Sequence, residues 1–261
     1  MKKRSDAIGV VYEPRKIKQL AKAEVEADKI RALGKIKLSG IQERAMHRMI
    51  AEETIKQENI EKITAKAVNG LKDDSKPEDL ERDWIANFFD KCRLVSDEEM
   101  QSLWSRLLAK EANKPGAFSK RTVELVANLD KQDAHFFTKL MGFGFKFGSF
   151  FPFIYDVHNE IYNGQGIKFE TLSHLDSIGL VNFDAVNGYS FLDVEKPLNC
   201  HYFGTIINIE PPGSKRVELG VAFLTQAGKE LAPVCGASSH PELLEYVFKI
   251  WKEKGYRYSL I

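Results

Sequence analysis

Helix-start signals recur through the middle of this chain, and they constrain its fold more than any other feature. Residues 75–78 (Ser-Lys-Pro-Glu) place a serine before a first-turn proline and a glutamate, which is the pattern of a capping box. Ser96 and Glu99 repeat that pattern, and Ser119 and Asp130 each precede a further amphipathic segment. We therefore predict four consecutive helices, which form a central helical module.

Apolar residues follow these signals at helical spacing. Leu80, Trp84 and Phe88 share one stripe of the first helix, and Leu103 and Trp104 belong to the stripe of the second. A stripe that contains large aromatic side chains is typical of a buried face. Both tryptophans are therefore predicted to lie in the core of the module.

The segment before the module is charged and helical. Residues 1–66 contain 16 Lys and Arg against 10 Asp and Glu, although the whole chain has a net charge of only +1. The apolar residues of this segment form a thin stripe with irregular heptads. We expect amphipathic helices that dock on the next module or on a partner, rather than a long coiled coil.

The periodicity changes after residue 156. A short helix over residues 169–178 is followed by a strand, by the hairpin signal Asn187-Gly188 and by a second hairpin signal at residues 211–214. Thr225 then caps a helix, and residues 256–260 alternate like a strand. This order predicts a small α+β domain of winged-helix type.

Together these segments predict a mainly α chain with three parts. The parts are a charged N-terminal helical region (1–74), the central helical module (75–155) and the α+β winged-helix-like domain (156–261). Residues 136–155 contain eight phenylalanines, but lysines, glycines and a proline interrupt them. They are therefore too short and too broken for a membrane span, and we expect a helix end and a buried connecting loop.

The composition indicates a cytoplasmic globular protein. Of all residues, 43% are apolar and 29% are charged. Three cysteines without disulfide-scaffold spacing fit a reducing compartment. The N-terminal sequence lacks the apolar run of a signal peptide.

Catalytic and metal-binding patterns are missing from the sequence. The glycines of residues 142–148 alternate with bulky aromatics, which would keep a phosphate away from the backbone. Four residues of the types that bind zinc, Cys200, His201, Cys235 and His240, lack the spacing of a zinc clip. We therefore predict no catalytic residue, no cofactor, no metal and no small-molecule substrate.

Three further histidines are isolated in the sequence. His135, His158 and His174 each lie among apolar or aromatic residues, with no nucleophile beside them. Each is interpreted as a structural residue.

Nucleic acid is a further candidate partner. Arg15, Lys16, Lys18 and Lys22 form a basic cluster near the N-terminus, and they are the candidate contacts. The recognition helix that a winged-helix domain would use, within residues 167–180, carries few basic residues. The basic cluster is therefore the better electrostatic candidate, with a solvated helix face as the alternative.

Four segments, residues 81–85, 96–109, 115–119 and 129–134, resemble a bacterial family of unknown function. That resemblance covers the chain from about residue 41 to its C-terminus. Residues 81–140 are also similar, more distantly, to the abortive-infection alpha family of phage-resistance components. The resemblance implies no site residues, because neither family has established catalytic residues.

The sequence thus favours a non-enzymatic interaction or regulatory component, whose role in phage defence is what the resemblance implies. A protein partner or self-association is expected. Two alternatives stay open: a nucleic-acid-binding regulator, and a hydrolase or nuclease whose catalytic residues meet only in space.

Overall fold

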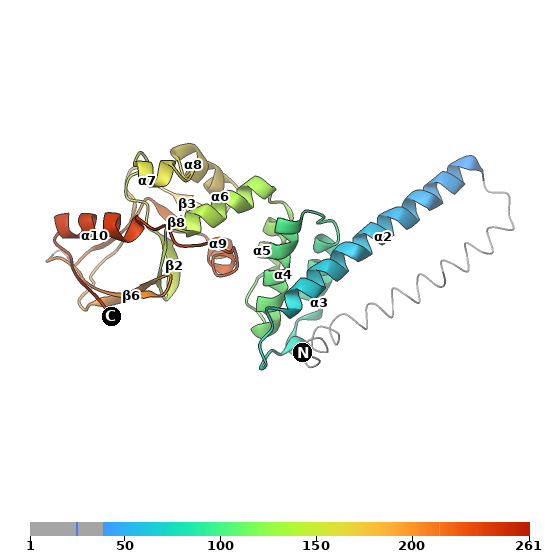
Figure 1. Ribbon diagram of the computed structural model, residues 1–261, viewed down its shortest axis with the longest axis horizontal. Helices are drawn as coiled ribbons and strands as arrows, with labels where there is room; N and C mark the ends of the chain where they lie inside the picture. Colours follow the sequence, from blue (N-terminus) through green and yellow to red (C-terminus); the bar gives the residue numbers. More distant parts are fainter. Residues whose placement is uncertain (1–24, 26–38, 214) are drawn as a thin grey trace. The chain divides into compact units, whose positions relative to one another are not determined.

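The computed structural model describes residues 25, 39–213 and 215–261, and these residues form an α+β protein (Figure 1). About 49% of them are helical and 16% lie in strands. The prediction of a mainly α chain is therefore wrong. Its error lies in the C-terminal half, which holds a five-stranded antiparallel sheet.

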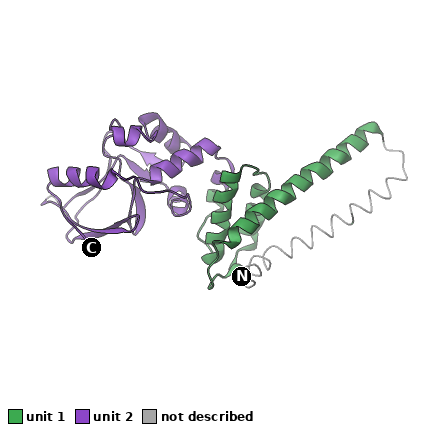
Figure 2. Cartoon of the chain, viewed as in Figure 1, with its two compact units in different colours: residues 1–123 green, residues 124–261 purple. Residues whose placement is uncertain are grey.

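The chain divides into two compact units, residues 1–123 and residues 124–261 (Figure 2). The boundary falls inside a helix, α5 (Lys120–Ala127). The other helices described in the first unit are α2 (Gly40–Val68), the 3₁₀ helix η1 (Pro77–Asp79), α3 (Arg82–Cys92) and α4 (Glu98–Asn113). The division into three parts at residues 74/75 and 155/156 stays a prediction.

Aromatic side chains from α3 and α4 form the core of the first unit. The rings of Trp84 and Phe88 stack with their centroids 5.1 Å apart, and Phe88 meets Trp104 edge-on at 5.1 Å. Phe88 and Trp104 are fully buried and Trp84 nearly so. The predicted core positions of both tryptophans are confirmed.

The helix starts agree with the sequence in part. Ser119 accepts a hydrogen bond from the amide of Thr122, and Asp130 exchanges hydrogen bonds with Asp133 in a capping box, as predicted. However, α4 is capped by Asp97 instead of Ser96, because the Asp97 carboxylate accepts from the amides of residues 99 and 100. The signal at residues 75–78 precedes only η1, and α3 begins later.

Only the last third of α2 is packed. Asn59 is its first buried residue: it donates a hydrogen bond to the carbonyl of Arg93 at 3.0 Å and accepts one from Gln101 at 3.2 Å. Ile60 and Ile63 are buried after it. Within the first unit, α2 runs on past α3 and α4 in the direction of its N-terminal end (Figure 1).

The second unit combines a sheet with helices. Its helices are α6 (Lys131–Met141), α7 (Glu160–Asn163), α8 (Phe169–Ser177), α9 (Gln226–Leu231) and α10 (Leu243–Glu253). Its strands are β1 (Gly144–Phe147), β2 (Ser149–Pro152), β3 (Val181–Phe183), β4 (Tyr189–Phe191), β5 (Leu198–Tyr202), β6 (Thr205–Glu210), β7 (Val217–Gly220), β8 (Ala222–Leu224) and β9 (Arg257–Leu260). The main sheet has the order β2-β1-β5-β6-β9, and two strand pairs, β3-β8 and β4-β7, lie outside it.

The phenylalanine-rich segment forms a β-hairpin, where the sequence suggested a loop. Gly148 lies between β1 and β2 with a φ of 74°, a conformation that glycine adopts without steric cost. Phe145 and Phe153 are fully buried, and their rings stack with centroids 4.4 Å apart. Of the glycines and the proline that suggested a loop, Gly142 lies at the end of α6, Gly148 forms the turn, and Gly144 and Pro152 lie at strand ends.

The predicted wing hairpins do not form. β3 pairs with β8 and β4 pairs with β7, so Asn187-Gly188 does not join two paired strands. The apolar run over residues 201–209 is divided into β5 and β6 by a turn at Phe203 and Gly204, both with positive φ. A local turn signal does not determine which strand a segment pairs with, and the winged-helix assignment is therefore incorrect.

Several local predictions for this unit are confirmed. α8 lies within the predicted range and is followed by Gly179 with a φ of 83°. Thr225 caps α9 by accepting a hydrogen bond from the amide of Gly228. β9 matches the predicted C-terminal strand and completes the main sheet beside β6.

Candidate functional site

Among the described helices, the N-terminal two thirds of α2 are the longest segment without a buried residue. No residue of the segment 40–58, here called the exposed half of α2, is buried. Of its apolar residues longer than alanine, Met46 is half-buried and the others are exposed. The exposed large apolar residues are Ile41, Met49, Ile50 and Ile55. The helix thus presents apolar side chains for more than four turns with no described residue covering them.

Met46 and Met49 continue the buried stripe of the same helix. Each precedes a buried isoleucine, Ile60 or Ile63, by fourteen residues, which is two heptads and places both on one helical face. Between them, Lys56 forms a 2.7 Å ion pair with Glu53 on the same face. The stripe is therefore apolar at both ends and charged in its middle, which explains why it is thin in the sequence.

Charge is unevenly distributed along the exposed half. Arg44 and Arg48 outnumber Glu43 in its first part, whereas three glutamates accompany a single lysine in residues 52–59. At the junction of the two parts, Nε of Arg48 lies 3.8 Å from Oε1 of Glu52. Within the exposed half, residues before Met49 therefore carry a net positive charge and residues after Ala51 a net negative charge.

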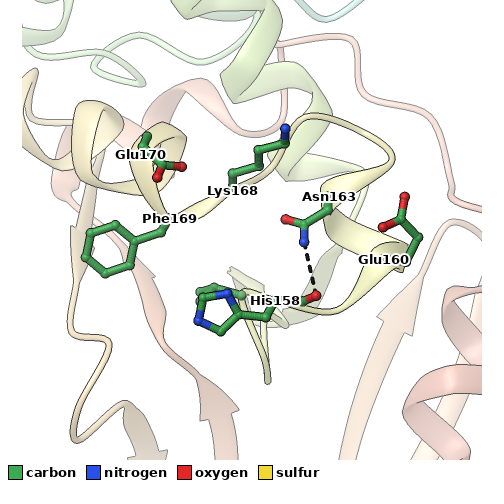
Figure 3. A pocket seen from close by; sticks show the side chains of 7 residues that line it. His158, Glu160, Asn163, Lys168, Phe169 and Glu170 are labelled. Atoms are coloured by element: carbon green, nitrogen blue, oxygen red, sulfur yellow. Dashed lines mark hydrogen bonds between the residues drawn. The ribbon is translucent and has the colours of Figure 1, made fainter.

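A hollow of about 340 Å³ lies beside α7 and the start of α8 in the second unit (Figure 3). The amide of Asn163 donates a hydrogen bond to the carbonyl of His158 at 3.0 Å and closes one side of it. The residues that line it are Val157, His158, Glu160, Asn163, Lys168, Phe169 and Glu170.

The chemistry of this hollow is that of a hydrated surface. Its His158, Lys168 and two glutamates are all exposed, and Phe169 is 46% exposed. In Figure 3 the side chains of Glu160 and Glu170 lie on opposite sides of the view. Exposed charged side chains stay hydrated. They therefore stabilise a bound substrate less than the side chains of a closed active site do.

The structure places the cysteines and histidines apart from any metal-type arrangement. Cys200 is fully buried in β5, and the thiol of Cys235 is hydrogen-bonded to the carbonyl of Ala232. The ring of His240 stacks on Phe143. Among the residues that the structure describes, no group of three or more His, Cys, Asp or Glu side chains is placed to hold a metal ion.

One histidine has a partner that sequence reasoning missed. The Nε2 atom of His174 in α8 lies 2.7 Å from the carboxylate of Asp133 in α6. Asp133 also accepts the amide of Asp130, so its carboxylate joins the start of α6 to α8. Both partners have structural roles in this geometry, and no nucleophile lies beside them in the interactions described.

A second missed arrangement is a tyrosine and tryptophan network in the second unit. The hydroxyl of Tyr155 accepts a hydrogen bond from Trp251 Nε1 at 2.9 Å and donates one to the carbonyl of Glu218 at 3.3 Å. Desolvation raises the pKa of Tyr155 well above its ordinary value. Because this hydroxyl both accepts and donates a hydrogen bond inside the protein, its role is structural. No sequence signal could indicate the network, because its members are far apart in the chain.

The four candidate nucleic-acid contacts, Arg15, Lys16, Lys18 and Lys22, lie outside the described residues. The structure therefore gives them no position. The helices within the described ranges include none that is both long and apolar enough to cross a membrane.

Comparison with known proteins gives one family. A family model described as "Protein of unknown function (DUF2806)" matches residues 43–248. This match supports the resemblance to a family of unknown function, whereas nothing in the comparisons supports the similarity to the abortive-infection alpha family. No curated protein and no solved structure matches the chain.

Proposed function

This chain belongs to the DUF2806 family of proteins of unknown function, and we propose that it works as a non-enzymatic interaction component that binds another protein chain through the exposed half of α2. One observation carries this proposal: a helical face that is buried from Asn59 onward continues over residues 40–58, where no residue that the structure describes buries its apolar side chains.

A partner would stabilise a helix of this kind. Helices in proteins owe most of their stability to the packing of an amphipathic face. The exposed half of α2 is 19 residues long by its bounds and shares only its far end with the core of the first unit. Covering Met49 and Ile50 would remove apolar surface from water, which favours binding.

A role in phage defence is the finer part of the proposal. It rests on the resemblance of residues 81–140 to the abortive-infection alpha family. An interaction component in such a system would act by binding a partner protein, and the exposed half of α2 supplies a surface for that binding.

The test uses the tagged full-length chain, expressed in the organism that encodes it. Sedimentation of the cell extract should show the chain in a complex larger than its own 29.7 kDa. Replacing Met49 and Ile50 with lysine should return it to the monomer. The matched control replaces Val186 and Leu192, which are 90% and 68% exposed in the second unit, with lysine and should leave the complex intact. A monomeric wild type, or a complex that both variants leave unchanged, would contradict the proposal.

A further inference from the structure

We infer that β9 pairs with β9 of a second copy of this chain, in antiparallel orientation about a two-fold axis at Ser259. The two main sheets then form one continuous sheet. This inference does not rest on the proposed function, because β9 belongs to the second unit and the exposed half of α2 to the first. It is carried by the open edge of β9 and by the order of its side chains.

The backbone of β9 has an unpaired edge. The amide of Ile261 donates to the carbonyl of Ile206 at 3.0 Å, so the odd-numbered residues of β9 direct their backbone groups toward β6. The amides and carbonyls of Tyr258 and Leu260 therefore face away from β6. β9 is the last strand of the main sheet, and no strand within the described residues pairs with this edge.

The opposite edge of the same sheet is protected against pairing. The amide of Phe153 donates to the carbonyl of Phe143, so the backbone groups of Phe150 and Pro152 in β2 face outward. Proline has no amide hydrogen, and a proline at this position blunts a sheet edge. β9 contains no proline, so its edge keeps both outward donors.

An apolar row of the sheet continues to β9 and is exposed there. Ile207 and Ile209 of β6 are fully buried. Their partners on β9, Leu260 and Tyr258, are 61% and 37% exposed. The ring of Tyr258 stacks on Phe248 of α10 with centroids 4.4 Å apart, which holds it in place. A further strand beside β9 would cover both side chains and remove apolar surface from water.

The strand that fits this edge is β9 itself in reversed orientation. With the axis at Ser259, Tyr258 of each copy lies opposite Leu260 of the other, so the apolar rows of the two sheets join. The amides of these two residues then donate to each other's carbonyls, and the axis repeats the exchange, which uses every outward group of both residues. A two-fold interface requires a surface that is its own complement, and β9 meets that requirement.

The other face of the sheet is polar up to the same edge. Ser259 lies opposite Asn208 of β6, whose amide donates to the side chain of Asn199 at 2.7 Å. The axis places the two Ser259 side chains opposite each other, where their hydroxyls can form a hydrogen bond. A polar row thus meets a polar row on this face.

The charge of β9 is compatible with its own copy. Arg257 is the one charged residue of the strand, and its Nη1 atom lies 3.6 Å from Oε2 of Glu210 in the same chain. In the register centred on Ser259, Arg257 lies opposite Ile261 of the second copy. Like charges directly opposite each other, which destabilise a strand pair, are therefore avoided.

The interface is small, because β9 has only four residues. We therefore expect a dimer that forms at high protein concentration and dissociates on dilution. The tagged chain in a cell extract is dilute, so this dimer does not interfere with the test of α2.

The test is sedimentation equilibrium of the purified full-length chain and of two variants, Ser259→Lys and Ser259→Asp. Each variant alone sets like charges opposite each other at the axis, so its dissociation constant should rise about threefold or more. An equimolar mixture of the two sets opposite charges there and should associate at least as tightly as the wild type. The controls Asn182→Lys and Asn182→Asp change an exposed residue of β3, outside the main sheet, and should associate as the wild type does.

Three outcomes would overturn the inference. A wild type that stays monomeric up to high concentration excludes the strand pair, and it leaves the proposed function to its own test in the cell extract. Variants of Ser259 that weaken association without recovery in the mixture show that this residue does not face its copy. Self-association that is lost on replacing Met49 and Ile50 with lysine, but is unchanged by both Ser259 variants, belongs to α2 instead of β9.

Discussion

Met49 and Ile63 lie on one face of α2, fourteen residues apart, yet Ile63 is fully buried while Met49 is 43% exposed. One helical face is therefore buried at one end and exposed at the other, with the ion pair of Glu53 and Lys56 between the two parts. The change occurs at Asn59, whose side chain joins α2 to Arg93 and Gln101. The exposed part of this face is the surface through which we propose that the chain binds a partner.

Substitutions at the two ends of this stripe should differ in their effect on stability. Ile63→Ala leaves a cavity in the core and should lower the free energy of unfolding by about 2 to 5 kcal/mol. Met49→Ala should change it by less than about 0.5 kcal/mol at a protein concentration low enough to keep the chain monomeric. Urea denaturation followed by the fluorescence of Trp84 and Trp104 measures both. Equal losses would show that Met49 is packed like Ile63.

Glu111 should be needed for the connection between α4 and α5. Its buried carboxylate accepts the amides of Gly116 at 2.7 Å and Phe118 at 2.9 Å. Glu111→Ala leaves these donors without their acceptor and should cost about 2 to 4 kcal/mol of unfolding free energy. Glu111→Gln keeps one accepting oxygen and should cost less. The neighbouring substitution Lys110→Ala is the control, and a similar loss for it in urea denaturation would refute the assignment.

Gly220 should tolerate no side chain. Its φ is 102°, and an added Cβ would overlap the backbone of Ile154, whose carbonyl accepts the amide of Val221 at 2.8 Å. Gly220→Ala should lower the free energy of unfolding by at least about 3 kcal/mol. Gly213 has open space around its Cβ position, so Gly213→Ala should be neutral or slightly stabilising. Thermal unfolding of the two variants side by side measures the difference.

Cys200 should be chemically inert in the folded protein. Burial raises the pKa of its thiol to about 12, and the side chain is fully buried. The unfolded chain would ionise this thiol near pH 8.5, so the stability associated with it is complete below that pH and is lost as the pH rises toward 12. Alkylation at pH 8.5 with mass spectrometry of the peptides should find Cys200 unmodified until urea is added. Rapid modification without urea would show that the thiol is accessible.

The sequence predicts those parts of the fold that depend on residues close together in the chain. Asp130, Ser119 and Thr225 cap helices through hydrogen bonds that span three residues, so the pattern is visible locally. Gly179 ends α8 for the same reason. Strand partners are different: β9 pairs with β6 about 50 residues earlier, and no turn signal connects them. The mainly α prediction failed because two such distant pairs, β1 with β5 and β6 with β9, assemble the sheet, and because the β1–β2 hairpin was interpreted as a loop.

The candidate site was visible in the sequence only as a thin apolar stripe among charges. The stripe suggested helices that dock on the next module or on a partner, and the last third of α2 does pack on α3 and α4. Which part docks depends on Asn59, whose hydrogen-bond partners lie 34 and 42 residues further along the chain. Met46 and Met49 precede Ile60 and Ile63 by fourteen residues in the sequence. This spacing could have indicated that one helical face packs on the module at one end and is exposed at the other.

Site-specific cross-linking from α2 tests the central claim most directly. The three native cysteines are buried, so they offer no competing exposed thiol. A photoreactive label on Met49→Cys should cross-link the chain to another protein chain in the cell extract, because this position lies on the proposed binding surface. The same label on Val186→Cys, which is 90% exposed in the second unit, should not. No cross-linked product from Met49→Cys, or equal cross-linking from Val186→Cys, would contradict the account.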